Sequence, residues 1–385
     1  MIFKYKTKVG TLPNVIATVK KGRQYNPLEW IKPTGRTIIK GGIVVDPANN
    51  IEEVKDISVF DNRIQEVADE IKAEKGDRII DASGLLVVPG LIDMHLHLGD
   101  LFEVTTNPIY GAVADGVTLA LSPGAGNTFM APSLLGAEVD RGVPMNIGVY
   151  LGELAVMGCA LSVEELISLF KGELDEEIAF QKMTRNRITY LTAPLTVGIK
   201  DHMGHWLASD ELYDKTFEVT SKAGLIYMSH TQDPDHAERL VDLSKGRPIH
   251  LAHANIAGCG THGDPVEGMK RIVELARQEH VSAEFNTTML RPGLGSREGL
   301  KMTKESQKVA YKALSDGVVN ILISDGQNDA TMKGFGDTRD NIPCLIELAD
   351  IGVLSLSESI ATMTANPARL IAKLTKEDWW IKELG

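Results

Sequence analysis

The pattern of hydrophobic and polar positions along this chain changes near Pro89. Before that residue, short β-branched runs are interrupted by Gly-Gly, Asp-Pro and Asp-Asn pairs, as in RTIIKGGIVVDP (36–47), ISVFDNRIQEVA (57–68) and DRIIDASGLLVV (77–88). Strand-forming runs separated by turn residues are typical of a small β-domain. After Pro89, short apolar runs alternate with longer segments that have helical periodicity.

Eight apolar runs in the second part predict strands. They cover residues 91–97, 117–121, 146–151, 195–200, 225–230, 249–253, 281–286 and 319–325. Helical segments lie between them, for example 264–280 with Asp264 as N-cap, and 303–317 with Thr303 as N-cap and Gly317 past the end. Alternating strands and helices imply a parallel sheet, and eight such units imply a closed (β/α)8 barrel.

The same pattern divides the chain into four parts. We expect a basic N-terminal arm (1–35), a small β-domain built mainly from N-terminal residues (36–88), a barrel (89–374) and a C-terminal tail (375–385). The class is α/β, with the barrel as the larger unit.

Composition excludes several function classes. Of 385 residues, 43% are hydrophobic and 24% are charged, the balance of a globular protein with a large core. The net charge of -12 and the aromatic content of 5% argue against binding to nucleic acid or to an anionic membrane. No run of 18 apolar residues occurs, and the three cysteines form no disulfide or zinc pattern, so we expect a cytoplasmic protein.

The first predicted strand lies in VVPGLIDMHLHLGD (87–100), an apolar stretch that is interrupted by an aspartate and two histidines before it ends at Asp100. Alternation along a strand places Asp93, His95 and His97 on one face. The opposite face then holds the apolar residues Ile92, Met94, Leu96 and Leu98. Two histidines aimed in one direction are either ligands of one metal ion or hydrogen-bonded core residues, and the strand alone does not decide between them.

Other predicted strands also end in potential ligands. The fourth ends in Lys200, the fifth in His230, the sixth in His253 and the eighth in Asp325. Each has a structural alternative, such as a core histidine or an aspartate that caps a turn. His250 is expected to be a core histidine, because it lies an odd number of residues from His253 and therefore faces the opposite side of the strand. Carboxyl ends of barrel strands meet at one rim, so the joint occurrence of these residues favours a metal site.

Four segments resemble the amidohydrolase superfamily of metal-dependent hydrolases. They are PGLIDMHLH from Pro89, VGIKDHM from Val197, SDG at 324–326 and TANPARLI at 364–371. The second resembles the branch with a bridging carboxylated lysine, which includes isoaspartyl dipeptidase, dihydroorotase and hydantoinases. The resemblance extends from Arg36 to Leu374. It departs at the end, where the chain reads KLTKEDWWIKELG in place of the strands that usually complete the small domain.

The resemblance implies a site with two divalent metal ions, for which Zn²⁺ is the expected metal. His95, His97 and Asp325 would hold one ion and His230 and His253 the other, with Lys200 bridging them as its CO₂-derived carbamate. A hydroxide shared by the ions would attack a carbonyl carbon, and Asp325 would pass its proton to the departing nitrogen.

The predicted activity is hydrolysis of a C–N bond in a small molecule, a cyclic amide or ureide first. The alternatives are an N-acyl amino acid or isopeptide hydrolase, a mononuclear heterocycle deaminase, and a non-catalytic scaffold related to dihydropyrimidinase. The expected partner is a small-molecule substrate, and the chain is expected to form a dimer or a tetramer. The candidate substrate-binding residues on the loops after the strands are Glu153, His202, Asn255 and Arg291.

Overall fold

The computed structural model describes most of the chain. The described residues are 35–61, 63–98, 108–124, 126–140, 145–202, 208–296, 299–326 and 335–377. The predicted basic arm, apart from Gly35, and the predicted tail after Glu377 lie outside these ranges.

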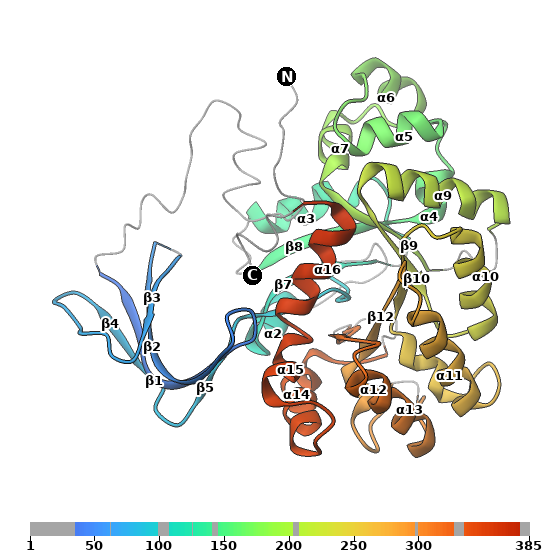
Figure 1. Ribbon diagram of the computed structural model, residues 1–385. Helices are drawn as coiled ribbons and strands as arrows, with labels where there is room; N and C mark the ends of the chain where they lie inside the picture. Colours follow the sequence, from blue (N-terminus) through green and yellow to red (C-terminus); the bar gives the residue numbers. More distant parts are fainter. Residues whose placement is uncertain are drawn as a thin grey trace.

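The N-terminal part forms a small, strongly curved sheet that stands beside the barrel (Figure 1). Its strands are β1 (Thr37–Asp46), β2 (Ile51–Phe60), β3 (Arg63–Ala68), β4 (Arg78–Asp81) and β5 (Leu86–Val87). β2 is antiparallel to β1 and β3, whereas β4 and β5 each run parallel to β1. The Gly41-Gly42 pair does not end the first strand. It forms a bulge inside β1, where Gly41 adopts a φ of 70°.

The barrel sheet has eight parallel strands in sequence order. They are β6 (Leu91–Asp93), β7 (Val117–Ser122), β8 (Asn146–Gly152), β9 (Thr196–Asp201), β10 (Ile226–His230), β11 (Ile249–Ala252), β12 (Val281–Asn286) and β13 (Ile321–Ile323). The first and last strands meet just after their ends, where Asp325 N–H donates to His95 C=O at 2.9 Å and His97 N–H donates to Gly326 C=O at 3.1 Å. The predicted (β/α)8 barrel with a small β-domain is confirmed.

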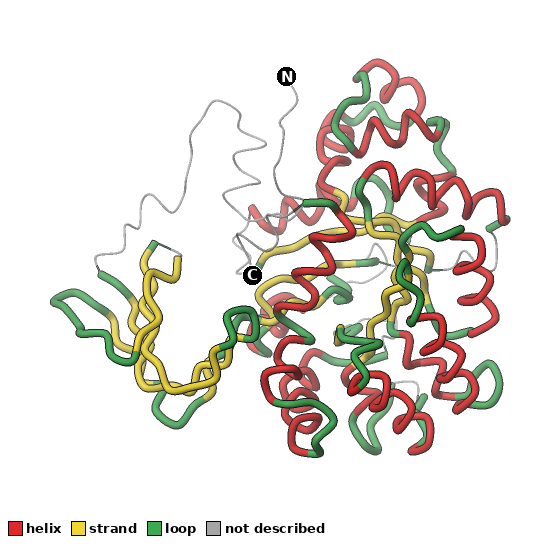
Figure 2. Tube along the Cα trace, viewed as in Figure 1, coloured by secondary structure: helices red, strands yellow, loops and turns green. Residues whose placement is uncertain are grey.

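Helices cover the outside of the barrel strands (Figure 2). They are α2 (Pro108–Ala114), α3 (Ala131–Asp140), α4 (Glu153–Met157), α5 (Val163–Phe170), α6 (Glu176–Lys182), α7 (Arg187–Thr192), α9 (Asp210–Ala223), α10 (Pro234–Ser244), α11 (Pro265–Ala276), α12 (Thr287–Leu290), α13 (Lys304–Ser315), α14 (Asn341–Asp350), α15 (Leu356–Ala361) and α16 (Ala365–Thr375). Asp264 and Thr303 cap α11 and α13 as expected, each accepting backbone N–H groups of its own helix. No helix within the described ranges has both the length and the apolar character needed to cross a bilayer.

Two apolar clusters form the core. The larger lies between the barrel strands and the surrounding helices, and the smaller fills the barrel interior and is closed by Ala368 and Ile371 of α16. Ile92 and Met94 belong to the inner cluster, whereas Leu96 and Leu98 belong to the outer one, so the prediction that these four residues share one face is wrong. The regular strand ends at Asp93, and the bends that follow at Met94 and His95 break the alternation on which the prediction depended.

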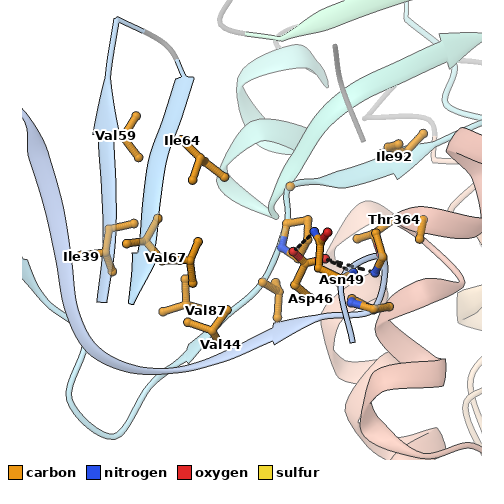
Figure 3. Close-up of a pocket in the computed structure, with 17 residues that line it drawn as sticks. Ile39, Val44, Asp46, Asn49, Val59, Ile64, Val67, Val87, Ile92 and Thr364 are labelled. Atoms are coloured by element: carbon orange, nitrogen blue, oxygen red, sulfur yellow. Dashed lines mark hydrogen bonds between the residues drawn. The ribbon is translucent and has the colours of Figure 1, made fainter. Parts of the chain in front are cut away.

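A pocket of about 370 Å³ lies between the small sheet and the barrel (Figure 3). Its lining is mostly apolar, with Ile39, Val67 and Val87 from the small sheet facing Ile92 at the start of the barrel. Asp46 is its titratable lining residue, and that carboxylate accepts a 2.6 Å hydrogen bond from Asn49. This pocket lacks the groups that hydrolysis needs, so the candidate chemistry lies elsewhere, at the carboxyl ends of the strands.

Candidate metal centre

The first and last barrel strands bring three potential ligands together. The Nε2 atoms of His95 and His97 each lie 3.1 Å from the same Asp325 oxygen, Oδ1. The ligand atoms of the three residues all lie within 4.8 Å of one another, and their side chains are buried. Two imidazole nitrogens and a carboxylate oxygen that converge in this way suit Zn²⁺ or a similar divalent ion.

Strands β9, β10 and β11 complete a ring around these residues. The His253 ring lies 5.1 Å from that of His95 and 4.6 Å from that of His230. Lys200 is 1% exposed, and within the described ranges neither its Nζ nor Nδ1 of His253 has a hydrogen-bond partner. Buried polar atoms without partners are costly unless another group satisfies them. The donor set therefore fits bound cations better than it fits an apolar core.

Burial also sets the protonation of this ring. It lowers the pKa of Lys200 to about 8, although the Glu284 and Asp325 carboxylates oppose that change. Burial, followed by the charges of neighbouring basic groups, lowers the pKa values of His230 and His253 well below the usual range. Neutral imidazoles keep a lone pair for a metal ion, whereas protonated ones do not.

Two of the predicted ligands have unusual backbone conformations. His253 has a φ of 37° and Asp325 a φ of 48°, in the left-handed region that costs a non-glycine residue conformational energy. His253 directly follows β11, and Asp325 lies two residues after the end of β13. Conformations of this kind persist where surrounding contacts enforce them, and they concentrate at functional sites.

Asp93 makes hydrogen bonds to the two chain segments that carry the His-His-Asp ligands. Its carboxylate accepts the N–H of His95 at 3.1 Å, the N–H of Ser324 at 3.2 Å and the hydroxyl of Ser324 at 2.5 Å. It thus ties the segment that carries the two histidines to the one that carries Asp325. Burial raises the Asp93 pKa to about 6, despite these hydrogen bonds.

Of the predicted substrate-binding residues, His202 lies beside the histidine ring. Its imidazole is 5.5 Å from that of His230 and 6.4 Å from that of His97. Burial, then the charges of Lys200 and His97, lowers its pKa to about 4. Asn255 is buried, and its amide is bonded to the backbone of Asn286 at both ends.

Glu153 and Arg291 contact residues other than the predicted metal ligands. Glu153 is buried beside Tyr227, whose hydroxyl lies 3.4 Å away within the outer cluster, and burial raises its pKa to about 8. Arg291 forms ion pairs with Asp340 and Glu347.

Two residues near the ring were not predicted. Glu284 accepts a 2.5 Å hydrogen bond from Nδ1 of His95, and Phe335 lies 5.0 Å from the ring of His253. A sequence signal exists for Glu284, because it is the one charged residue in the buried run VSAEFN. Phe335 has none, since it lies outside the strands.

Comparisons with known proteins agree with this architecture. The model of the amidohydrolase family matches residues 86–373. The dihydroorotase of Trichlorobacter lovleyi is 24% identical over 364 residues, which cover 87% of this chain and 84% of that protein. The dihydroorotase of Aquifex aeolicus is 24% identical over 380 residues, with coverage of 87% and 85%.

Solved structures show the same fold at lower identity. The L-hydantoinase (dihydropyrimidinase) of Arthrobacter aurescens has a TM-score of 0.62 at 16% identity, with coverage of 87% of this chain and 82% of that one. The β-aspartyl dipeptidase of Fervidobacterium islandicum has a TM-score of 0.59 at 17% identity, with coverage of 88% and 87%. Because the family model spans most of the sequence and the barrel agrees with it, this chain belongs to the amidohydrolase family.

Proposed function

We propose that this amidohydrolase hydrolyses a C–N bond of a small cyclic amide or ureide with the help of two divalent metal ions. The observation that carries the proposal is the buried ring at the carboxyl ends of the barrel strands. There a His-His-Asp triad lies beside two further histidines, His230 and His253, and beside Lys200, whose Nζ has no hydrogen-bond partner among the described residues. Active sites of (β/α)8 barrels occur at this rim.

The residues divide into two ligand groups. His95, His97 and Asp325 would hold one ion, and His230 and His253 the other, with Zn²⁺ as the proposed metal. When bound, such ions polarise a carbonyl group and lower the pKa of water towards neutrality. Asp325 is the proposed proton carrier. It would accept a proton from the attacking water and deliver it to the departing nitrogen.

Lys200 would join the two groups as a carbamate. Its neutral amine attacks CO₂, forms an N–C bond and releases one proton, which leaves an anion with two oxygens. With a pKa of about 8, about a quarter of the side chains are neutral at pH 7.5, against about one in a thousand for an ordinary lysine. Burial thus favours a modification that an exposed lysine would rarely undergo.

The substrate class is inferred from the relatives. The similar proteins include enzymes named dihydroorotase and hydantoinase, after dihydroorotate and hydantoin, and both of these compounds are cyclic ureides. His202 is the proposed substrate-binding residue, because it lies beside the predicted ligands. Asn255 and Arg291 are left out of the proposed site, since their polar groups are bonded to other parts of the protein. Glu153 is left out because it lies beside Tyr227 of the outer cluster.

The test combines metal analysis with a substrate screen. We expect about two zinc ions per chain in protein purified without chelator, an intact mass increased by one CO₂, and hydrolysis of dihydroorotate or a hydantoin. His95→Ala and Lys200→Ala should lose metal and activity while the far-UV circular dichroism of the barrel is retained. Full activity in either variant would refute the proposal. One ion with an unmodified lysine would favour deamination, and no metal binding would favour a scaffold.

A further inference from the structure

Glu284 of β12 is a fully buried carboxylate at the centre of the site, yet it belongs to neither ligand group. Its Oε1 accepts a 2.5 Å hydrogen bond from Nδ1 of His95 and a 3.2 Å hydrogen bond from the backbone N–H of His253. Glu284 and both histidines are at most 2% exposed. One oxygen atom therefore contacts a residue from each half of the predicted metal centre.

The contact with His95 fixes which ring nitrogen carries the proton. A carboxylate only accepts hydrogen bonds, so Nδ1 of His95 must be the protonated nitrogen. Nε2, which faces Asp325 at 3.1 Å, then keeps its lone pair for a metal ion. Hydrogen bonds of this kind orient metal-binding histidines and raise their basicity.

The contact with His253 acts on the backbone. His253 has a φ of 37°, and its N–H is held at the start of the turn that follows β11. A charged acceptor in a dry site makes a strong hydrogen bond to an N–H group. That bond helps to hold the left-handed conformation, and with it the direction in which the imidazole leaves the chain.

The other oxygen of Glu284 is held in turn. Its Oε2 accepts a 2.9 Å hydrogen bond from Nε2 of His250, whose Nδ1 lies 2.8 Å from the hydroxyl of Ser282. With Nε2 protonated, Nδ1 of His250 accepts the proton of that hydroxyl. His250 and Ser282 are paired across β11 and β12, so both strands fix the position of the carboxylate. His250, which was predicted to be a core histidine, thus belongs to a chain of hydrogen bonds that leads through Glu284 to His95.

We propose that Glu284 is a shared positioning residue for both metal ions, setting the ring of His95 for one and the backbone of His253 for the other. The inference rests on the proposed function, because it assumes that these histidines bind metal. It predicts that a residue that is not a ligand controls both sites at once. A carboxylate that served only to fill the core would have no such effect.

The test uses Glu284→Gln, which keeps the size of the side chain but has a single acceptor oxygen. Gln cannot accept hydrogen bonds from His95 and His250 on two separate oxygens. Metal-free protein is titrated with Zn²⁺ against a chromophoric chelator, and with Co²⁺ to record the d–d absorption of each ion. We expect the affinities for both ions to fall by about 10–100-fold and the d–d bands to change.

The matched control is Asp56→Asn in the small sheet. Asp56 is also a buried carboxylate that accepts two backbone N–H groups, from Gly41 and Ile71. The Asp56→Asn variant should have a lower melting temperature than the wild type but the same affinity for each metal ion. If Glu284→Gln does not fold, His250→Asn is used instead, because the shorter asparagine side chain does not reach Glu284. We then expect the affinity for both ions to fall several-fold.

The outcomes separate the two levels of inference. Two ions in the wild type with unchanged affinities in the variant would overturn the positioning role and leave the proposed function intact. Loss at one ion alone would overturn the shared role. A wild type that binds fewer than two ions would overturn the proposed binuclear function and this inference with it.

Discussion

Lys200 should destabilise the metal-free protein, and replacing it with Met should make that protein more stable. The side chain is 1% exposed, and burial lowers its pKa from 10.5 to about 8. The interval between these values corresponds to about 3 kcal/mol, the cost of keeping the ammonium in the folded protein. Met has a similar length and no charge, so Lys200→Met should raise the free energy of unfolding at pH 7 by about 3 kcal/mol while abolishing metal binding.

The pH dependence gives the sign of this effect. Between pH 8 and 10.5 the unfolded chain binds a proton that folded Lys200 does not, so the stability of the wild type rises with pH across this window. Below about pH 8 the cost is fully present. The advantage of Lys200→Met should therefore shrink by roughly half between pH 7 and pH 9.5.

The assay is chemical denaturation of chelator-treated protein at both pH values. Lys312→Met, at a lysine whose side chain is 74% exposed, is the matched control and should change the stability by less than about 0.5 kcal/mol. Equal stabilities of Lys200→Met and wild type at pH 7, or a difference that does not depend on pH, would show that the buried ammonium is not the source of the cost.

Three further predictions concern other parts of the molecule. Gly224→Ala should lower the free energy of unfolding by about 1–2 kcal/mol more than Gly317→Ala. Both glycines have a φ near 70°, but a Cβ at Gly224 would lie 2.9 Å from a backbone carbonyl at the end of α16, whereas a Cβ at Gly317 would have no atom within 4 Å. Equal losses of stability on thermal unfolding would contradict this prediction. The Arg36 guanidinium lowers the pKa of Asp77 to about 2, so the stability that this pair contributes is present above about pH 4 and is lost as the pH falls towards 2. Asp77→Asn should flatten that acid slope in urea titrations, and an unchanged slope would count against the pair. Arg291→Ala should lower the stability by about 1–2 kcal/mol with kcat/KM unchanged, because the guanidinium is paired with two carboxylates; a raised KM would return Arg291 to the substrate site.

Local features made the barrel predictable from the sequence. Each of the eight predicted apolar runs overlaps one of the eight barrel strands, because strands buried on both faces need continuous apolar sequence. The caps Asp264 and Thr303 mark helix starts through hydrogen bonds within one turn. The first strand was predicted too long, since its alternation continues through Met94 while the backbone already bends.

The site was predictable where a residue's role follows from its place on a strand. His230 is the last residue of β10 and Lys200 is the penultimate residue of β9, so the barrel alone brings them towards one rim. Partnerships across the fold were not predictable in this way. Arg291 contacts Glu347, 56 residues away, and Glu284 contacts His95, 189 residues away. No local pattern indicates which distant groups satisfy a charge, so substrate-binding residues chosen by loop position alone remain predictions.

The seam of the barrel has a consequence for how the enzyme is made. The hydrogen bonds that join the first and last strands involve the backbones of His95, His97 and Asp325, the same residues that are proposed to hold the first ion. On the ribosome, the two histidines emerge early, and Asp325 follows more than 200 residues later. The nascent chain therefore cannot complete this ion site until nearly the whole barrel has been synthesised. Capture of the first ion should then coincide with the final closure of the fold.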